Sequence, residues 1–105
     1  MAVSATTAEE LAAEAVAVLE TGRQIAPFSR RLTAFSLDDA YRVTAAVRGL
    51  RETRGKRPVG RKIGFTNRTT WPDYEPMWGD VYDRTVHDLA DLDGTFLLKG
   101  GRAAY

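Results

Sequence analysis

The chain has 105 residues, and its 15 lysines and arginines nearly balance 14 aspartates and glutamates, which leaves a formal net charge of +1. This length fits one small domain, taken as residues 1–105, and the charge gives no general attraction to nucleic acid or membrane surfaces. Cysteine is absent, which excludes disulfides, thiolate metal sites and cysteine nucleophiles. Without a leader pattern or an apolar run that could span a bilayer, a cytoplasmic protein is expected.

A first helix is predicted over about residues 7–21. Thr7 with Glu10 has the spacing of a capping box, and Gly22 supplies a left-handed end. The segment 23–32 has little periodicity and reads as a connector. The apolar stripe of this helix is expected at Leu11, Ala15, Val18 and Leu19.

A second helix is predicted over about residues 37–54. Ser36 with Asp39 is its start signal, and Gly55 closes it. Its buried stripe is expected at Ala40, Val43, Val47 and Leu50. Two helices that precede the strands predicted below favour an α+β fold.

A basic run lies at the end of the second helix and continues beyond it. Its only acidic neighbour is Glu52, and its members are Arg48, Arg51, Arg54, Lys56, Arg57, Arg61 and Lys62. Such a run could bind phosphate groups of an anion or RNA. Cations also suit a helix C-terminus for dipole reasons alone, and long charged side chains usually form a solvated face. The balanced overall charge argues against nucleic acid as a partner.

The stretch 59–66 reads as a strand with one nearly bare face. Alternation places Lys62 on the same side as two glycines, Gly60 and Gly64, and as Thr66. A lysine between glycines leaves room beside its ammonium group for a small ligand or another backbone. The alternative is that the glycines mark a bulge and that Lys62 extends into water.

Two further strands are predicted over about 80–86 and 95–98, after a long loop. The loop carries Trp71 and Tyr74 and ends near Trp78, and these aromatics could cover a site or pin the loop to the core. Alternation in the strand could turn Asp83 inward, where a carboxylate needs a partner or a raised pKa. A surface turn at Asp83 is the alternative.

Four segments, taken in order, resemble the N-terminal part of the 2-keto-4-pentenoate hydratase family, which includes 4-oxalocrotonate decarboxylases and is related to fumarylacetoacetate hydrolase. They are residues 21–27 (TGRQIAP), 36–41 (SLDDAY), 60–67 (GRKIGFTN) and 78–86 (WGDVYDRTV). The resemblance implies two helices packed on the first strands of a mixed sheet, as an incomplete fumarylacetoacetate hydrolase-like roll. It also implies a homo-oligomer, or association with a complete homologue.

The same resemblance implies a lyase of aromatic-compound catabolism that adds water to a 2-hydroxydienoate or its 2-oxo form. Lys62 matches the family's active-site lysine and Asp83 its acidic residue on the next strand, which makes them the catalytic candidates. Gly64, Thr66 and Trp78 are the substrate-binding candidates. A cation at Lys62 would stabilise charge that develops on a dienolate oxygen, and Asp83 would move a proton or position water.

The family's divalent metal, usually magnesium, is held by a Glu-x-Glu strand that this chain does not show. The last glutamate is Glu75, and no acidic residue follows Gly94. Because magnesium needs hard oxygen ligands, no metal site is expected within these residues, and little activity is expected from the chain alone. A non-catalytic partner that docks an open sheet edge on a complete homologue is the alternative function.

Overall fold

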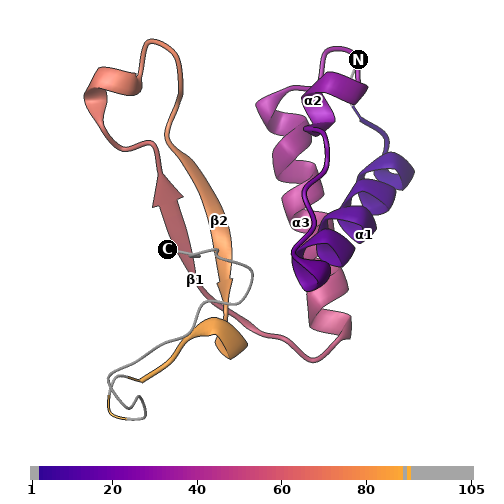
Figure 1. Ribbon diagram of the computed structural model, residues 1–105, viewed down its shortest axis with the longest axis vertical. Coiled ribbons are helices and arrows are strands. Elements are labelled where there is room, and N and C mark those ends of the chain that lie inside the picture. Colours follow the sequence, from indigo (N-terminus) through magenta and orange to yellow (C-terminus); the bar gives the residue numbers. More distant parts are fainter. Residues whose placement is uncertain (1–2, 89, 91–105) are drawn as a thin grey trace. The chain divides into compact units, whose positions relative to one another are not determined.

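The computed structural model describes residues 3–88 and 90 of the chain. The chain divides into two compact units, Met1–Gly55 and Lys56–Tyr105. The first is helical and the second contains a β-hairpin (Figure 1), so the α+β fold class is confirmed. The single domain over residues 1–105 stays a prediction. Within the described part of the chain, no helix is both long and apolar enough to cross a membrane.

Helix α1 (Ala5–Thr21) begins two residues before its predicted start. Its N-cap is Ser4, whose hydroxyl oxygen accepts a hydrogen bond of 3.1 Å from the Thr7 amide. The predicted Thr7 cap was therefore wrong, because Ser4 takes the capping position one turn earlier. The C-terminal end is as predicted, since Gly22 adopts φ +70° and its amide bonds the Val18 carbonyl at 2.9 Å.

The buried face of α1 differs from the predicted stripe. Leu11 is buried as expected, but Leu19 is 59% exposed. Alanines supply much of the true face, since small side chains let a second helix approach closely, and alanine contributes little to a hydrophobic pattern. The buried residues of α1 are Ala8, Leu11, Ala12 and Val16.

Helix α3 (Leu37–Thr53) begins with the predicted capping box. Ser36 Oγ accepts from the Asp39 amide at 3.1 Å, and Asp39 Oδ2 accepts from the Ser36 amide at 3.0 Å. Between α1 and α3, the one-turn helix α2 (Phe28–Arg31) occupies part of the predicted connector. The rings of Phe28 and Phe35 meet edge to face, with centroids 6.2 Å apart.

The core of the first unit forms where α1 packs on α3. Val43 of α3 is buried against three residues of α1, Ala8, Leu11 and Ala12. Of the predicted α3 stripe, Val43 is fully buried and Val47 packs partly buried against the same cluster. The other half-buried apolar residues around the cluster are Val3, Phe28, Leu32, Phe35 and Ala46.

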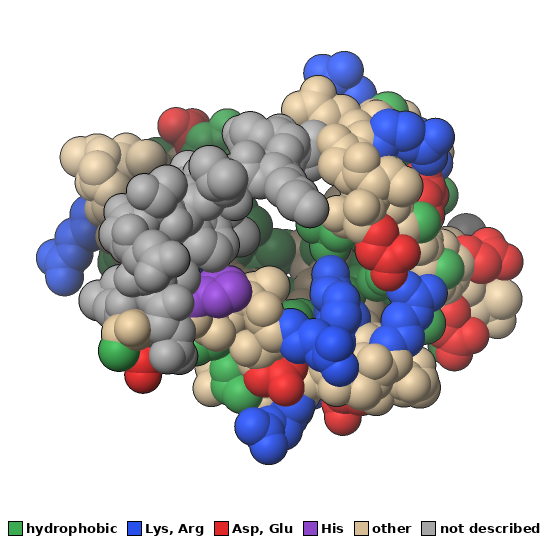
Figure 2. Space-filling model, turned by 60° about the horizontal axis from the view of Figure 1, so that its bottom comes forward, with side chains coloured by type: hydrophobic (Ala, Val, Ile, Leu, Met, Phe, Trp, Pro, Cys, Tyr) green, Lys and Arg blue, Asp and Glu red, His purple; other side chains and the backbone are tan. Residues whose placement is uncertain are grey.

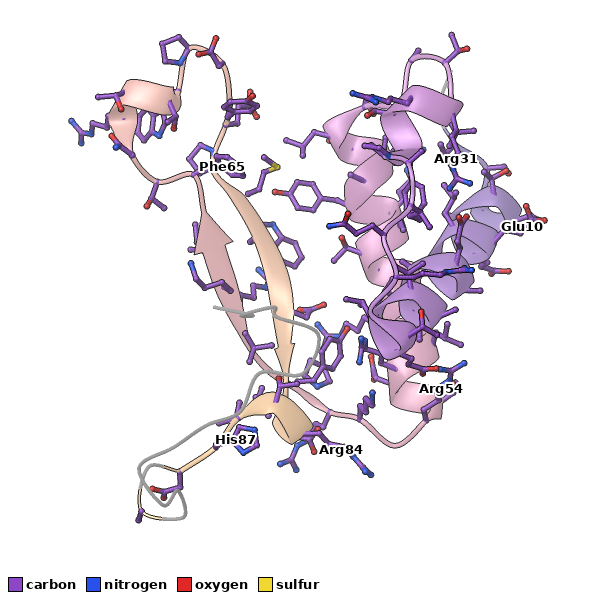
Figure 3. All side chains as sticks on the ribbon, viewed as in Figure 1. Glu10, Arg31, Arg54, Phe65, Arg84 and His87 are labelled. Atoms are coloured by element: carbon purple, nitrogen blue, oxygen red, sulfur yellow. The ribbon has the colours of Figure 1, made fainter. Side chains whose placement is uncertain are left out.

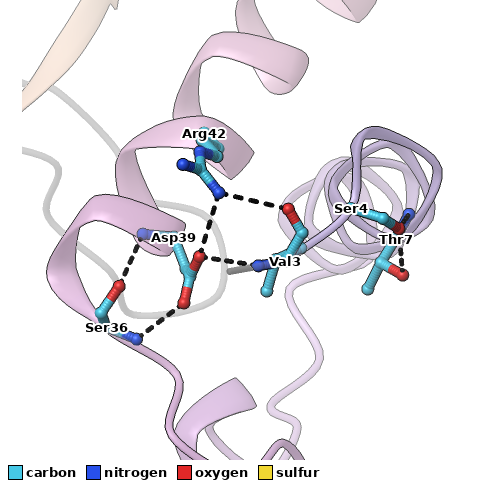
Figure 4. A network of polar contacts seen from close by, with 6 residues as sticks. All are labelled: Val3, Ser4, Thr7, Ser36, Asp39 and Arg42. Carbon is cyan, nitrogen blue, oxygen red and sulfur yellow. Dashed lines mark hydrogen bonds and ion pairs between the residues drawn. The ribbon is translucent and has the colours of Figure 1, made fainter. Parts of the chain in front are cut away.

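Asp39 is the one buried charged side chain among the described residues, with 2% of its surface exposed. Besides capping α3, its Oδ1 accepts a 2.9 Å hydrogen bond from the Val3 amide (Figure 4). Arg42 lies 3.5 Å from the same oxygen and donates to the Val3 carbonyl at 3.3 Å. Asp39 therefore ties the segment before α1 to the start of α3.

The second unit is an antiparallel hairpin of β1 (Pro58–Gly64) and β2 (Met77–Tyr82). The predicted strands 59–66 and 80–86 were wrong in their bounds, because Phe65 turns out of the first and a short 3-10 helix, η2 (Asp83–Thr85), ends the second. The described sheet is antiparallel rather than mixed. The strand predicted over 95–98 lies outside the described residues.

Two leucines of α1, Leu11 and Leu19, test which face of the helix is buried. We expect Leu11→Ala to lower the free energy of unfolding by roughly 2–3 kcal/mol, because it removes packed methyl groups from the core. Leu19→Ala is the matched control and should change it by less than about 0.5 kcal/mol, since Leu19 is exposed. Urea unfolding followed by circular dichroism measures both, and a reversed order of the two variants would contradict the packing of α1 on α3.

Asp39 makes the stability of the helical unit depend on pH. Hydrogen bonds from the backbone amides of Ser36 and Val3 hold the pKa of Asp39 below its ordinary value of 3.8. The carboxylate's contribution is therefore fully present above pH 3.8 and lost as pH falls through the lower, folded-state pKa.

Asp39→Asn should accordingly have a lower free energy of unfolding than the wild type at neutral pH. The difference should narrow as the pH falls below 3.8 and through the folded-state pKa of Asp39. Urea unfolding at both pH values measures this. Asp38→Asn, an exposed neighbour in the same first turn of α3, is the control. A gap between wild type and Asp39→Asn that stays constant with pH would show that the charge of Asp39 is not what stabilises the unit.

Candidate functional site

Lys62 lies at the centre of a hairpin face that is lined by glycines. Its partner across the ladder is Gly79, and its neighbours on the same face of β1 are Gly60 and Gly64. A Cβ atom built on any of these three glycines meets no heavy atom within 4 Å, so the space above them is open. The bare face predicted from the sequence is therefore present, and β2 extends it.

Gly79 is the site residue that the sequence reasoning missed. The signal was a glycine inside an otherwise strand-like segment, which typically marks a close approach of a ligand or another backbone. Two apolar residues of β2, Met77 and Val81, flank Gly79 on its own face and are half-buried. Met77 and Val81 thus lie at the two ends of an open strip of glycine backbone, and Lys62 lies on that strip.

The Lys62 ammonium is exposed and contacts the backbone of its own strand. Nζ donates a 2.6 Å hydrogen bond to the carbonyl oxygen of Ile63. A lysine side chain has several rotatable bonds, so this local bond does not fix the ammonium over the glycines. The structure thus has the open face, and it also has both parts of the alternative, since a bulge lies between Pro58 and Gly60 and Lys62 is exposed. The catalytic role of Lys62 stays a prediction.

Trp78 lies on the opposite face of the hairpin from Lys62. The register pairs it with Ile63, and Arg61 stacks over its ring with the guanidinium carbon 4.1 Å from the ring centroid. Neighbouring residues in a strand point to opposite sides, so Trp78 and Gly79 face different ways. The structure therefore does not bring Trp78 to Lys62, and its substrate-binding role stays a prediction.

Gly64 is the last residue of β1, and the chain turns immediately after it. Phe65 has φ +57°, a left-handed conformation that is uncommon for a residue other than glycine. The strand alternation therefore stops before Thr66, which was expected on the Lys62 face. Gly64 adjoins Lys62 as predicted, and the substrate-binding roles of Gly64 and Thr66 stay predictions.

The loop between the strands is held by its own contacts. A 3-10 helix, η1 (Arg68–Thr70), is capped by Asn67, whose Oδ1 accepts from the Thr69 amide at 3.1 Å. The rings of Phe65 and Tyr74 lie with centroids 5.2 Å apart. Trp71 is 47% exposed and Tyr74 is 55% exposed, so neither is pinned in the core.

Asp83 lies in η2, beyond the end of β2, and not on the strand where it was predicted. Its Oδ1 accepts from the amides of Arg57 and Arg84, each at 3.0 Å. These bonds, led by the one from Arg57, hold the pKa of the Asp83 carboxyl below its ordinary value. Asp83 therefore stays ionised at neutral pH. It lies in a surface turn, which was the alternative to a carboxylate that points inward.

Lys62 and Asp83 are not neighbours in the hairpin. Four residues of β1 lie between Lys62 and Arg57, the partner of Asp83, and these five steps correspond to about 15 Å of strand. Figure 3 shows Phe65, which follows β1, and Arg84, which follows Asp83, at opposite ends of the hairpin. The catalytic role of both residues stays a prediction, and the described residues do not place them in one site.

Within the described residues, no group of three or more histidine, aspartate or glutamate side chains could hold a metal ion. Two open hollows of about 410 and 400 Å³ lie along α1 and α3. Alanine is the commonest lining residue of both; Glu9 lines both hollows and Arg42 only the second, so neither gathers several reactive groups.

Two members of the basic run at the end of α3 form ion pairs with glutamates. Arg48 contacts Glu52 at 3.2 Å, and Arg54 pairs with Glu20 of α1. On the face shown in Figure 2, lysine and arginine side chains lie among acidic ones. This arrangement is that of a solvated surface more than of a phosphate-binding patch.

Two curated proteins are similar to this chain over most of its length. The 2-keto-4-pentenoate hydratase of Paraburkholderia xenovorans (strain LB400) and the 2-keto-4-pentenoate hydratase 3 of Pseudomonas putida are each 32% identical to it over 78 residues, 71% of the chain. The chain is hydratase-like in sequence. It spans 29% of the length of each relative. No family model matches the chain, and no solved structure matches it.

The open glycine face predicts that added side chains are tolerated at Gly79. We expect Gly79→Ala to change the free energy of unfolding by less than about 0.5 kcal/mol, because the added methyl group meets no atom. Gly22→Ala is the control and should destabilise by roughly 1–2 kcal/mol, because Gly22 has a positive φ. Urea unfolding measures both, and a large loss for Gly79→Ala would show that something covers this face.

Proposed function

We propose that the chain is part of a hydratase-like lyase and that it provides the cation that holds the anionic end of a 2-oxo or 2-hydroxydienoic acid. The observation that carries the proposal is the similarity to the two 2-keto-4-pentenoate hydratases. Hydration of such an acid passes through a dienolate, whose oxygen carries developing negative charge. A positioned ammonium group lowers the energy of that charge.

The geometry of the hairpin supports Lys62 as this cation. Lys62 lies on a strand face whose neighbouring positions are glycines, so no side chain covers the backbone beside it. A planar conjugated acid could lie flat on such a surface within reach of the flexible lysine side chain. The diagonal neighbours Met77 and Val81 would contact the apolar tail of the acid, while Lys62 holds its carboxylate or 2-oxo group. In this arrangement binding and charge stabilisation come from one strand pair.

Magnesium, which the family resemblance implies, does not fit the described residues. They bring no three carboxylate or histidine ligands together, and magnesium is bound through oxygen ligands in near-octahedral geometry. We therefore derive no step through a metal ion. What this chain's residues would do is bind the acid, orient it against the strand backbone and stabilise its enolate oxygen.

The proposal predicts that the chain binds 2-keto-4-pentenoate through Lys62. We expect Lys62→Met to weaken binding by roughly tenfold or more, because a charge-assisted contact is lost while the length of the side chain is kept. Isothermal titration calorimetry measures the affinity, and amide chemical-shift changes should centre on β1 and β2. Loss of dienoate absorbance after addition of the acid and magnesium tests turnover in the same samples.

Lys56→Met is the matched control, because Lys56 begins the same unit but precedes the hairpin. It should leave the affinity within about twofold of the wild type. Gly79→Val provides a second test, since its branched side chain fills the open strip without removing any charge. Equal affinities for wild type, Lys62→Met and Gly79→Val would exclude the glycine face as the binding site.

A further inference from the structure

The carboxylate of Asp83 replaces a backbone carbonyl in the hairpin ladder. The Asp83 amide donates to the Arg57 carbonyl at 2.9 Å, as in a pair of strand residues. In the return direction the Arg57 amide donates to the side-chain Oδ1 at 3.0 Å. The backbone carbonyl of Asp83 is used elsewhere, because it accepts from the Val86 amide at 3.2 Å and so closes η2. The side chain thus allows the chain to turn while the strands stay paired.

A bulge lies between this tie and the regular ladder. Counted from Arg57 opposite Asp83, an unbroken antiparallel ladder would pair Lys62 with Trp78. The observed register shifts between Pro58 and Gly60, so that Lys62 pairs with Gly79. Val59 is the extra residue, and an extra residue bends and twists the strand that contains it. The strand that carries Lys62 therefore leaves the base of the hairpin through a bend.

From these contacts we infer that Asp83 is a positioning residue that holds the Val59 bulge at the base of the hairpin and so sets how the Lys62 strand leaves it. The bulge persists because the hydrogen bonds between Asp83 and Arg57 hold Arg57 and Pro58 in a register that is shifted by one residue from that of Gly60 to Gly64. Without these hydrogen bonds, the register that pairs Gly60 with Val81 would extend to the start of β1, and Val59 would pair with Tyr82. This inference rests on the proposed function only for the role of Lys62.

The geometry also argues against a shared proton-transfer site. Both hydrogen bonds to Asp83 come from backbone amides at the end of the hairpin that lies away from Lys62. A group that transfers protons in the proposed hydration would need to reach the same small substrate that Lys62 holds. About 15 Å of strand separates the two, which is more than the length of that acid.

The test compares Asp83→Asn with Asp83→Ala by nuclear magnetic resonance on the full chain. In Asp83→Ala the amides of Arg57 and Arg84 lose their acceptor, so we expect them to exchange with deuterium roughly tenfold faster or more. Nuclear Overhauser contacts between Val59 and Tyr82 should appear as the bulge disappears, while those between Lys62 and Gly79 persist. Asp83→Asn keeps a carbonyl oxygen in place and should preserve both the slow exchange and the bulge.

Asp73→Ala, an exposed aspartate in the loop of the same unit, is the control and should leave all these signals unchanged. Unchanged exchange in Asp83→Ala would overturn the inference, and so would equal loss of protection in Asp83→Asn. If Asp83→Ala unfolds the hairpin, retained protection in Asp83→Asn still supports it, and loss in both overturns it. None of these signals needs a substrate, so a failure here is distinct from a failure of Lys62 to bind the acid.

Discussion

The same interaction holds each unit together: an aspartate carboxylate that accepts hydrogen bonds from backbone amides at the start or end of an element. In the helical unit, Asp39 bonds the amides of Ser36 and Val3 and so joins the segment before α1 to the start of α3. In the hairpin, Asp83 bonds the amides of Arg57 and Arg84. Around the buried Asp39 an unpaired amide would be costly, whereas the amides that bond Asp83 lie at the surface. In both units the carboxylate connects segments that are far apart in the sequence.

The sequence predicts the helices well where short-range chemistry decides them. Ser36 with Asp39 and Gly22 with its positive φ are signals that work within one turn, and the structure has both. The buried face of α1 could not be predicted in the same way. Which side of an alanine-rich helix is buried depends on the helix packed against it, so the leucine at position 19 was a poor guide.

The hairpin shows what strand alternation can and cannot establish. The alternation correctly placed Lys62 beside two glycines, since that needs only the period of one strand. Cross-strand pairing needs the register, which the Val59 bulge shifts by one residue. For that reason neither the position of Gly79 opposite Lys62 nor the place of Trp78 on the other face was accessible from the sequence.

Both tryptophans of the chain, Trp71 and Trp78, belong to the second unit. Each has an arginine guanidinium over its ring, Arg68 at 5.6 Å and Arg61 at 4.1 Å from the centroid. The long helices α1 and α3 belong to the first unit and contain no tryptophan. Intrinsic tryptophan emission therefore reports on the hairpin half alone, while the far-ultraviolet helical signal reports mainly on the other half, so melting of the two halves can be followed separately without any label.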